Sequence, residues 1–238
     1  MKLKTTNTCN VGLVGAGNIG SRHLQGIAKC KLKLNLFIID SNKTSLELSK
    51  SRYNYINKIK RKTVFSCKLN DLPKKIDILI VATNSVIRKK ILLQILKKIK
   101  IKYLILEKYT FQNSKDFLII KNILKKNKIK TWVNCPLRYM KDYINLKKKF
   151  NKKKFHIDIK GGNWNMASTM VHYIDLFCFY LDDTNFKFIK NKLNKKIILS
   201  KHKGCLEVNG SIKLMSKNGS TLTMTDDNKN TSTKINFF

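Results

Sequence analysis

Short apolar runs alternate with amphipathic segments along the first 134 positions of the chain. The apolar runs are rich in β-branched side chains and predict strands, which we expect over residues 11–14, 34–39, 62–66, 76–83, 103–106 and 130–134. The segments between them place apolar residues at helical spacing and predict helices over 21–30, 45–51, 86–99 and 117–126. Regular alternation with short connections predicts an α/β fold with a doubly wound parallel sheet.

The pattern changes after residue 134. A lysine-rich helix is expected within 137–151 and a second helix over 168–181, and further strands are expected over 155–159, 197–199, 205–208, 211–215 and 221–224. Asn218-Gly219 lies between the last two alternating runs and predicts a hairpin turn. We therefore expect two domains, residues 1–134 and residues 135–238, the second an α+β domain with a largely antiparallel open sheet.

A glycine-rich turn follows the first predicted strand. Gly15, Gly17 and Gly20 form the pattern G-x-G-x-x-G, with Asn18 and Ile19 opening the helix behind it. In a dinucleotide-binding unit the first glycine makes the tight turn, the second lets the backbone approach a pyrophosphate, and the third lets the helix pack on the strand. The pyrophosphate then lies on free N–H groups at the positive end of the helix. The sequence therefore predicts that residues 1–134 form a Rossmann domain that binds NAD or NADP.

Two other strand ends fit this interpretation. Asp40 ends the second predicted strand, 20 residues beyond Gly20, where a carboxylate accepts the ribose hydroxyls of NAD and repels the 2′-phosphate of NADP. The alternative is that Asp40 only starts a turn, and Lys43 nearby leaves NADP open. Thr83 and Asn84 follow the apolar run at 76–83, at the edge where ligands bind to such sheets.

The charge balance of the chain is extreme, with a formal net charge of +36 over 238 residues. Such a charge suggests nucleic acid or an anionic surface. However, the 45 lysines far outnumber the five arginines and are spread along the chain, and lysine, asparagine and isoleucine are all heavily used. A base bias in the coding sequence explains that pattern better than a nucleic-acid site, which usually relies on arginine. We expect no nucleic-acid partner.

Cysteine usage and hydropathy indicate the compartment. The six cysteines are scattered without a C-x-x-C pair, which favours reduced, buried thiols and no metal site. No apolar run approaches the ~20 residues that span a membrane, and the polar N-terminus does not resemble a signal peptide. The sequence predicts a cytoplasmic protein without a membrane partner.

Three residues could carry chemistry. Lys108 lies just after a strand end, beside Glu107, where it could polarise a substrate hydroxyl or carbonyl oxygen. His172 lies on the helix predicted over 168–181 with Asp175 one turn away, and an imidazole can exchange a hydroxyl proton near neutral pH. Alternatively, His172 is a core residue and Asp175 a surface residue.

Five motifs together resemble the Gfo/Idh/MocA oxidoreductases, the family of glucose–fructose oxidoreductase and inositol dehydrogenase. They are Gly12 to Gln25, Val81 to Asn84, Glu107-Lys108, Asn134 with Arg138, and His172 to Leu176. Their order and spacing match the family over most of the chain. The form of the last motif, with Gly161 to Trp164 ahead of it, looks most like members found in surface-polysaccharide gene sets.

This resemblance implies an NAD(P)-dependent oxidoreductase acting on a sugar, cyclitol or nucleotide-sugar hydroxyl. The family's catalytic pair corresponds to Lys108 and His172. The resemblance further implies that Glu107 lies with Thr83 and Asn84 on the cofactor side, and that Arg138, Ser168 and Asp175 bind substrate. It also implies a homo-oligomer, a dimer or tetramer, paired through the open C-terminal sheet.

The chain departs from the family pattern in three places. Tyr109 stands where a proline, often cis, usually follows the lysine, so the local turn is expected to differ. Ser168 stands four residues before His172, where many members carry an aspartate. Members also tend to be longer, and an apolar run ends at Phe237-Phe238, so the C-terminal sheet is expected to be curtailed. The alternative function is therefore a catalytically impaired, nucleotide-binding relative that acts as an assembly or regulatory partner.

Overall fold

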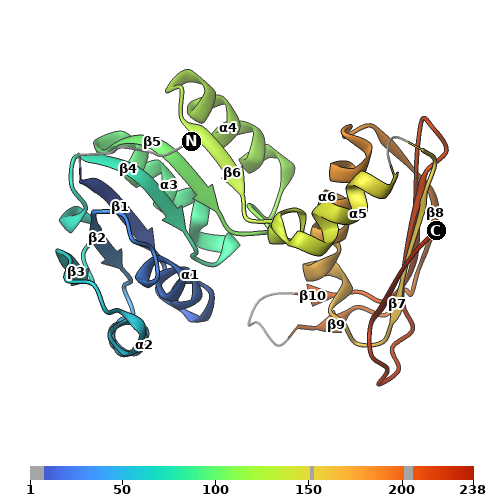
Figure 1. The fold of residues 1–238 in the computed structure, drawn as a ribbon, viewed down its shortest axis with the longest axis horizontal. Helices are drawn as coiled ribbons and strands as arrows, with labels where there is room; N and C mark the ends of the chain where they lie inside the picture. The colour runs from blue at the N-terminus through green and yellow to red at the C-terminus, as the bar shows by residue number, and fades with distance from the viewer. Residues whose placement is uncertain (1–7, 151–152, 201–205) are drawn as a thin grey trace. The chain divides into compact units, whose positions relative to one another are not determined.

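A computed structural model describes residues 8–150, 153–200 and 206–238 of the chain. Its backbone divides into two compact units, Met1–Asn134 and Cys135–Phe238 (Figure 1). Each unit has a sheet and a hydrophobic core of its own. They are described separately below.

The first unit is built on a six-stranded, all-parallel sheet in the order β3-β2-β1-β4-β5-β6. Its strands are β1 (Cys9–Val14), β2 (Leu34–Ile39), β3 (Thr63–Ser66), β4 (Lys75–Val81), β5 (Lys100–Leu106) and β6 (Lys130–Val133). The connecting helices are α1 (Asn18–Ala28), α2 (Lys43–Ile56), α3 (Ser85–Lys98) and α4 (Ser114–Lys126), with a short 3-10 helix, η1 (Leu69–Asp71). The order turns back beside β1, which confirms the predicted doubly wound fold.

Helices cover both faces of this sheet. Leu24 of α1 and Tyr53 of α2 belong to the core on one face, and Leu92 of α3 and Ile120 of α4 to the core on the other. The central strand β4 contributes to both cores, which explains its nearly continuous apolar sequence.

The predicted strands lie within one or two residues of their positions in most cases, while the helices differ more. α2 runs from Lys43 to Ile56, well beyond the predicted 45–51, because its outer face is polar and gives little periodicity. The side chain of Asn42 accepts a hydrogen bond from the backbone N–H of Ser45 and so caps its N-terminus.

The second unit contains a five-stranded sheet in the order β13-β7-β12-β11-β8. The strands are β7 (His156–Gly161), β8 (Phe186–Leu193), β11 (Gly210–Ser216), β12 (Thr221–Asp226) and β13 (Lys234–Phe237), and a separate pair joins β9 (Ile198–Leu199) to β10 (Leu206–Glu207). The helices are α5 (Lys141–Phe150), α6 (Met166–Leu181) and the 3-10 helix η2 (Pro136–Tyr139). All ladders of the larger sheet are antiparallel except that between β7 and β12, which confirms a largely antiparallel sheet.

The hairpin predicted at Asn218-Gly219 joins β11 to β12, with Gly219 at φ +80°. α6 packs on one face of the sheet, where Phe177 meets Leu214 and Leu222 in the core. Strand β8 was not predicted. It is an edge strand exposed along most of its length, and its lysines interrupt the apolar pattern that marks a buried strand.

The cysteine prediction is only partly correct. Cys9, Cys30, Cys67, Cys135 and Cys178 are free thiols, but of these only Cys135 is buried; Cys67 is exposed and the other three are partly exposed. Cys205, and with it the start of the strand predicted at 205–208, lies outside the described residues. Among the helices that the structure describes, none has the length and apolar character needed to cross a membrane.

Replacing Leu79 by alanine tests the core of the first unit. Leu79 lies in β4 and is fully buried, so Leu79→Ala should lower the free energy of unfolding by about 2–5 kcal/mol. Urea denaturation followed by tryptophan fluorescence measures this. In a Trp164→Phe background only Trp132 of β6 remains, so the signal reports on this unit.

Leu48→Ala is the matched control, because Leu48 lies on α2 and is 48% exposed. It should change the free energy by no more than about 0.5 kcal/mol. Equal losses in the two variants would contradict the assigned core.

Candidate functional site

The glycine turn between β1 and α1 shows a separate physical requirement at each glycine. Gly15 has φ +94°, and a Cβ there would lie 2.7 Å from the backbone of Ala82 and Thr83. A Cβ on Gly20 would lie 1.8 Å from the carbonyl oxygen of Gly15. Both glycines are therefore required by the packing of the protein itself.

Gly17 is different. A Cβ there would meet nothing within 4 Å, so packing does not require a glycine at this position. Gly17 precedes α1, where backbone N–H groups lack helical partners. A bare backbone facing open space at a helix N-terminus fits a ligand phosphate approaching closely.

The first residues of α1 agree with this arrangement. Ile19 is 53% exposed, although it is apolar. The side chain of Asn18 accepts a hydrogen bond from Arg52 of α2 at 3.4 Å, and Arg52 also donates to the hydroxyl of Ser21 at 3.2 Å. These bonds link the start of α1 to α2.

Asp40 lies at the carboxyl end of β2 and faces the turn. Its Oδ2 accepts a hydrogen bond from the backbone N–H of Ala16 at 2.6 Å, and its Oδ1 accepts one from the N–H of Asn42 at 2.8 Å. The carboxylate therefore fixes the glycine turn and starts the next loop. A carboxylate has about four lone-pair sites, so it retains acceptor capacity for ribose hydroxyls.

A cavity of about 380 Å³ opens beside these residues, entirely within the first unit. It is lined by Gly15, Gly17, Asp40, Thr83 and Asn84, and by Ile39, Ser41, Cys67, Leu69, Ile87, Ile91 and Gln94 among others. Asn84 caps α3 by accepting a hydrogen bond from the N–H of Val86 at 2.9 Å. The cavity combines apolar walls with a few polar groups at the carboxyl ends of parallel strands, as nucleotide sites do.

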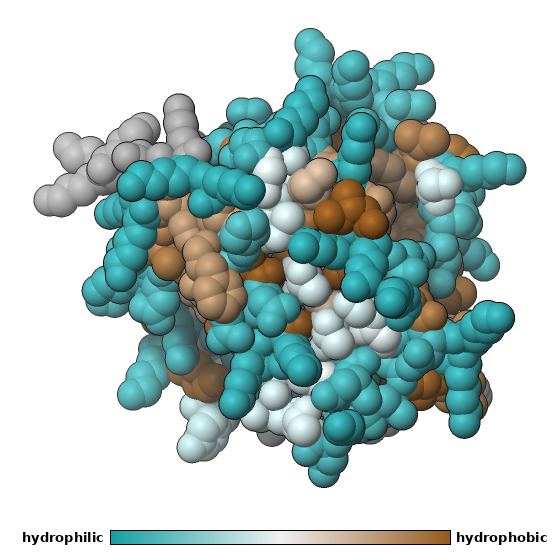
Figure 2. Space-filling model, turned by 90° about the vertical axis from the view of Figure 1, so that its right-hand side faces the viewer, coloured by the Kyte–Doolittle hydropathy of each residue, from teal (hydrophilic) through white to brown (hydrophobic). Residues whose placement is uncertain are grey.

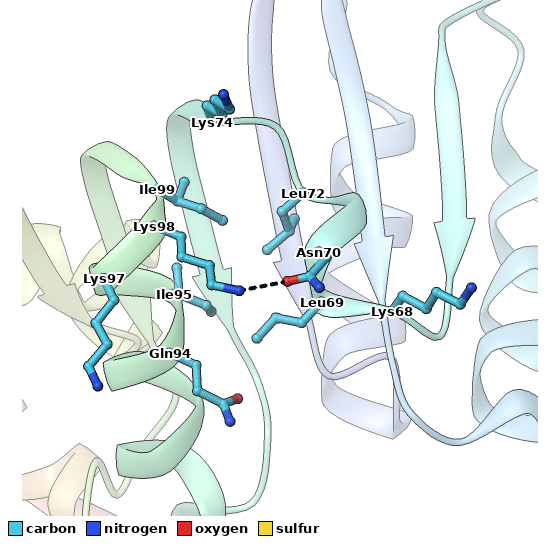
Figure 3. A pocket seen from close by; sticks show the side chains of 10 residues that line it. All are labelled: Lys68, Leu69, Asn70, Leu72, Lys74, Gln94, Ile95, Lys97, Lys98 and Ile99. Carbon is cyan, nitrogen blue, oxygen red and sulfur yellow. Dashed lines mark hydrogen bonds between the residues drawn. The ribbon is translucent and has the colours of Figure 1, made fainter.

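A larger cavity, of about 810 Å³, lies farther along α3 (Figure 3). Its floor is apolar, its rim carries Lys68, Lys74, Lys97 and Lys98, and Lys98 donates to Asn70 at 3.3 Å. It shares Leu69 and Gln94 with the smaller cavity. Its lining has no carboxylate, imidazole or glycine turn, so its chemistry matches a dinucleotide site less well.

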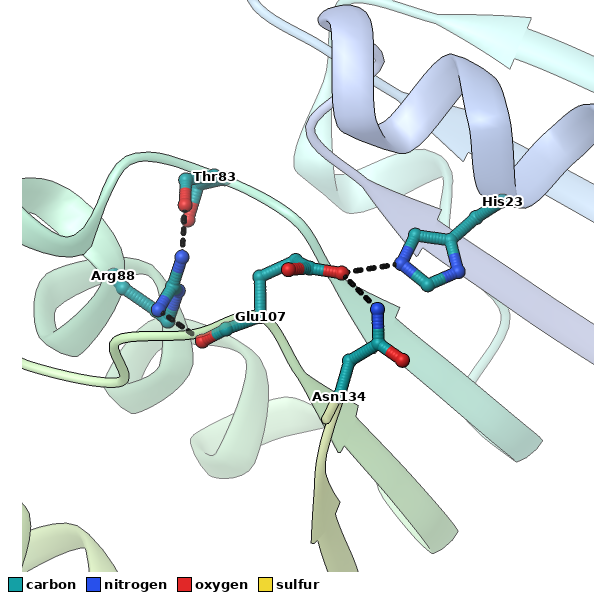
Figure 4. A network of polar contacts seen from close by, with 5 residues as sticks. All are labelled: His23, Thr83, Arg88, Glu107 and Asn134. Atoms are coloured by element: carbon teal, nitrogen blue, oxygen red, sulfur yellow. Dashed lines mark hydrogen bonds and ion pairs between the residues drawn. The ribbon is translucent and has the colours of Figure 1, made fainter. Parts of the chain in front are cut away.

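Polar side chains meet at the carboxyl ends of β5 and β6 (Figure 4). One oxygen of Glu107 accepts hydrogen bonds from His23 of α1 and from the amide of Asn134, both at 2.6 Å. Burial alone would raise the pKa of Glu107, but the bonds from His23 and Asn134 together outweigh it and hold the pKa below its usual value. Glu107 is therefore an anchored carboxylate.

Lys108 follows this anchored residue, and the Lys108–Tyr109 peptide bond is cis. The turn was expected to differ from the family form because tyrosine replaces proline, yet the cis geometry is present. The side chain of Arg88, from α3, donates hydrogen bonds to backbone carbonyls in the loops that follow β4 and β5. Those of Thr83 and Glu107 are shown in Figure 4.

In the second unit, Arg138 of η2 and Asp175 of α6 are paired. The Arg138 guanidinium donates to both carboxylate oxygens of Asp175, at 2.7 Å for the Nε bond, and also to the carbonyl oxygen of Asp175. The hydrogen bond that Arg138 donates to Asp175 raises the pKa of Arg138. Asp175 is thus engaged by Arg138, an arrangement that neither residue type nor helix spacing indicated.

The N-terminal turn of α6 carries Ser168 one turn before His172. The N–H of Ser168 donates to the buried carboxylate of Glu207 at 3.3 Å, and its hydroxyl donates to the carbonyl of Asn165. Asn165 itself provides no side-chain cap. Glu207 of β10 therefore supplies the negative charge at this helix end.

No role was predicted for His23, Arg88 or Glu207 from the sequence. His23 stood inside the glycine motif without an assigned role, and the partners of Arg88 are carbonyls that any sequence would provide. A signal was present for Arg88, which is one of only five arginines in a chain that otherwise uses lysine.

Comparisons with known proteins bear on this geometry. Residues 9–135 match the family model GFO_IDH_MocA, described as an oxidoreductase family with an NAD-binding Rossmann fold. No curated protein sequence matches the chain significantly.

The similarity to solved structures extends over most of the chain. Myo-inositol dehydrogenase from Lactobacillus casei, in complex with NAD(H) and myo-inositol, is 17% identical with a TM-score of 0.69, covering 96% of this chain and 71% of that one. The WlbA dehydrogenase from Bordetella pertussis, in complex with NADH and UDP-GlcNAcA, is 16% identical with a TM-score of 0.70, covering 97% and 72%. A putative NADPH-dependent oxidoreductase from Desulfitobacterium hafniense is 15% identical with a TM-score of 0.71, covering 98% and 70%. At these identities the likeness shows a shared fold.

Acid titration tests the anchored carboxylate. Because the folded-state pKa of Glu107 is lowered, its stabilising effect is present above the unfolded value of about 4.3 and is lost as the pH falls through the folded pKa. Glu107→Gln should lower the free energy of unfolding by about 1–3 kcal/mol at pH 7, and the difference from wild type should shrink below pH ~4. Urea denaturation between pH 7 and pH 3 measures it.

Glu47→Gln is the control, because Glu47 is exposed and its contact with Lys43 is 4.0 Å long. It should change stability little at any pH. If Glu107→Gln kept the same pH slope as wild type, the anchoring role of Glu107 would be wrong.

Proposed function

Because the chain belongs to the Gfo/Idh/MocA family of oxidoreductases, with an NAD-binding Rossmann fold, we propose that it transfers a hydride between NAD and a sugar-like substrate. The reacting group is a hydroxyl or carbonyl of a sugar, cyclitol or nucleotide sugar. The observation that carries the proposal is the cavity at the glycine turn, where Gly17 leaves open space and Asp40 presents a carboxylate.

The residues of this cavity fit the cofactor. Gly17 and the start of α1 would hold the pyrophosphate, with Asn18 and Ile19 beside it, and Asp40 would accept the adenosine ribose hydroxyls. Thr83 and Asn84 would line the opposite wall. The hydroxyl oxygen of Thr83 is buried and has no hydrogen-bond partner in the described part of the chain, which is the kind of atom that a ligand satisfies. The carboxylate of Asp40 favours NAD over NADP.

Two residues are proposed to act on the substrate. NAD, when bound, supplies the hydride acceptor at its nicotinamide ring. Lys108 donates a hydrogen bond to the reacting oxygen and stabilises its growing negative charge. His172 takes the hydroxyl proton as general base and passes it to solvent. Glu107, which His23 and Asn134 hold in place, is proposed to act on the cofactor side.

The substrate class is supported by relatives of the same fold. The Lactobacillus casei enzyme was crystallised with myo-inositol and the Bordetella pertussis enzyme with UDP-GlcNAcA. Arg138, Asp175 and Ser168 of the second unit are proposed to bind the substrate. Because Asp175 is paired with Arg138, we propose that the pair acts as one unit that presents the remaining guanidinium N–H groups.

The proposed homo-oligomer, a dimer or tetramer, pairs subunits through the outer face of the five-stranded sheet. Within the described ranges, α5 and α6 lie on the other face of this sheet (Figure 1). Figure 2 views the molecule from this side and shows mostly hydrophilic residues with scattered hydrophobic ones. A mixed surface of this kind is typical of an interface whose subunits are stable apart.

Substitution of two glycines tests cofactor binding. Gly17→Ala places a methyl group in the open space proposed for the pyrophosphate, so NADH affinity should fall by about tenfold or more, which corresponds to about 1.4 kcal/mol. Its melting temperature should stay close to that of wild type. Titration of NADH fluorescence and a thermal scan measure both quantities.

Gly20→Ala is the matched comparison. Its Cβ would collide with the Gly15 carbonyl, so this variant should lose stability as well as affinity. If Gly17→Ala bound NADH with wild-type affinity, the assignment of the pyrophosphate to this turn would be wrong.

Substitution of the two catalytic candidates tests the reaction. Lys108→Ala and His172→Ala should each lower turnover by about 10²–10⁴-fold, while NADH affinity is retained. Turnover is followed by the absorbance of reduced nicotinamide with myo-inositol, free sugars and UDP-hexuronic acids. Turnover close to that of wild type in Lys108→Ala would contradict the catalytic role proposed for Lys108.

The same substrate panel decides the alternative function. Tight NADH binding by the wild-type chain without turnover of any member would favour a catalytically impaired relative acting as an assembly or regulatory partner. Ser168, which lacks the carboxylate that many family members carry, is one of the three departures that motivate this alternative.

A further inference from the structure

We infer that Arg88 is a positioning residue that holds the backbone of Lys108 in place for the reaction. The inference rests on the proposed function for its catalytic readout. It assigns a task to a buried cation that neither the cofactor nor the substrate is proposed to touch.

Arg88 lies in the first turns of α3 and is only 2% exposed. Its guanidinium donates to the carbonyl oxygens of Glu107 at 2.6 Å, Tyr109 at 2.7 Å and Thr110 at 3.0 Å, and also to that of Thr83. These carbonyls belong to loops beyond the ends of β4 and β5, where the strand ladder no longer provides partners. One side chain therefore satisfies the backbone of two loops.

The bonds bracket Lys108. The Glu107 carbonyl belongs to the peptide unit that precedes Lys108, and the Tyr109 carbonyl belongs to the peptide unit that follows Tyr109. The backbone on either side of the Lys108–Tyr109 pair is therefore tied to one rigid, planar group. The carbonyl of Thr83 connects the same group to the wall of the nucleotide cavity. From the opposite side, His23 and Asn134 hold the carboxylate of Glu107 (Figure 4). The position of Lys108 relative to the cavity thus depends on Arg88.

The arrangement needs an arginine. A guanidinium offers five N–H donors in a fixed plane, whereas an ammonium is a point donor on a flexible stem. Burial lowers the pKa of Arg88 to about 10, partly offset by the nearby charge of Glu107, so the group remains a cation at neutral pH. In a chain with 45 lysines, the use of arginine here agrees with this geometric need.

Arg61 provides a matched comparison. Its guanidinium also donates to several backbone carbonyls, those of Ile27, Ala28 and Cys30, but these lie at the far end of α1. Arg61→Lys should therefore lower stability much as Arg88→Lys does. Only Arg88→Lys should affect the reaction.

The experiment measures kcat at saturating NAD⁺ and saturating hydroxyl substrate for both lysine variants, alone and combined with Lys108→Ala. We expect kcat to fall by about tenfold or more in Arg88→Lys and to stay within about twofold of wild type in Arg61→Lys, because small misplacement of a reacting group is costly. In the Lys108→Ala background, Arg88→Lys should have no further effect on kcat, since residues that act as a unit are not additive. Independent, multiplicative losses would overturn the inference.

Hydrogen exchange supplies a readout that does not need turnover. Backbone amides of residues 106–111 should exchange about tenfold faster in Arg88→Lys than in wild type, and at the wild-type rate in Arg61→Lys. If the wild-type chain turns over no substrate, the proposed function fails, and unchanged exchange at 106–111 would separately overturn the positioning role.

Discussion

The parallel register of the first sheet is the constraint on which the candidate site depends. At the ends of β1, β4, β5 and β6 one more backbone hydrogen bond continues the ladder: Gly15 donates to Ile39, Ala82 to Val14, Glu107 to Val81 and Asn134 to Leu106, all within 3.1 Å. These bonds fix the first residue of each of these four loops at the carboxyl edge. The backbone alone therefore aligns the glycine turn with the loops that carry Thr83 and Lys108.

This register explains what the sequence could predict. Apolar runs with turn residues at their ends are local signals, so strands such as β2 and β4 could be found, together with Gly15, Gly17, Gly20 and Asp40 at their ends. The hairpin at Asn218-Gly219 was equally local. These features need only spacing along the chain.

The remainder depends on contacts that spacing does not encode. Arg88 bonds to the carbonyl of Glu107, 19 residues away, and His23 bonds to Glu107, 84 residues away. Glu207 reaches Ser168 from a two-residue strand. None of these partners is marked by residue type. Strand β8 was missed for the opposite reason, since an exposed edge rich in lysine suppresses the apolar alternation that identifies a strand.

The bond between Asp40 and the Ala16 N–H links two properties that are usually treated apart. The carboxylate that we propose selects between NAD and NADP also holds the glycine turn, which is the proposed pyrophosphate site. Its orientation is set when the chain folds, so little side-chain entropy is left to lose when a ribose arrives. A substitution of Asp40 that changed the cofactor preference would therefore also remove the hydrogen bond that holds the glycine turn. A new cofactor preference would require a new way of fixing this turn.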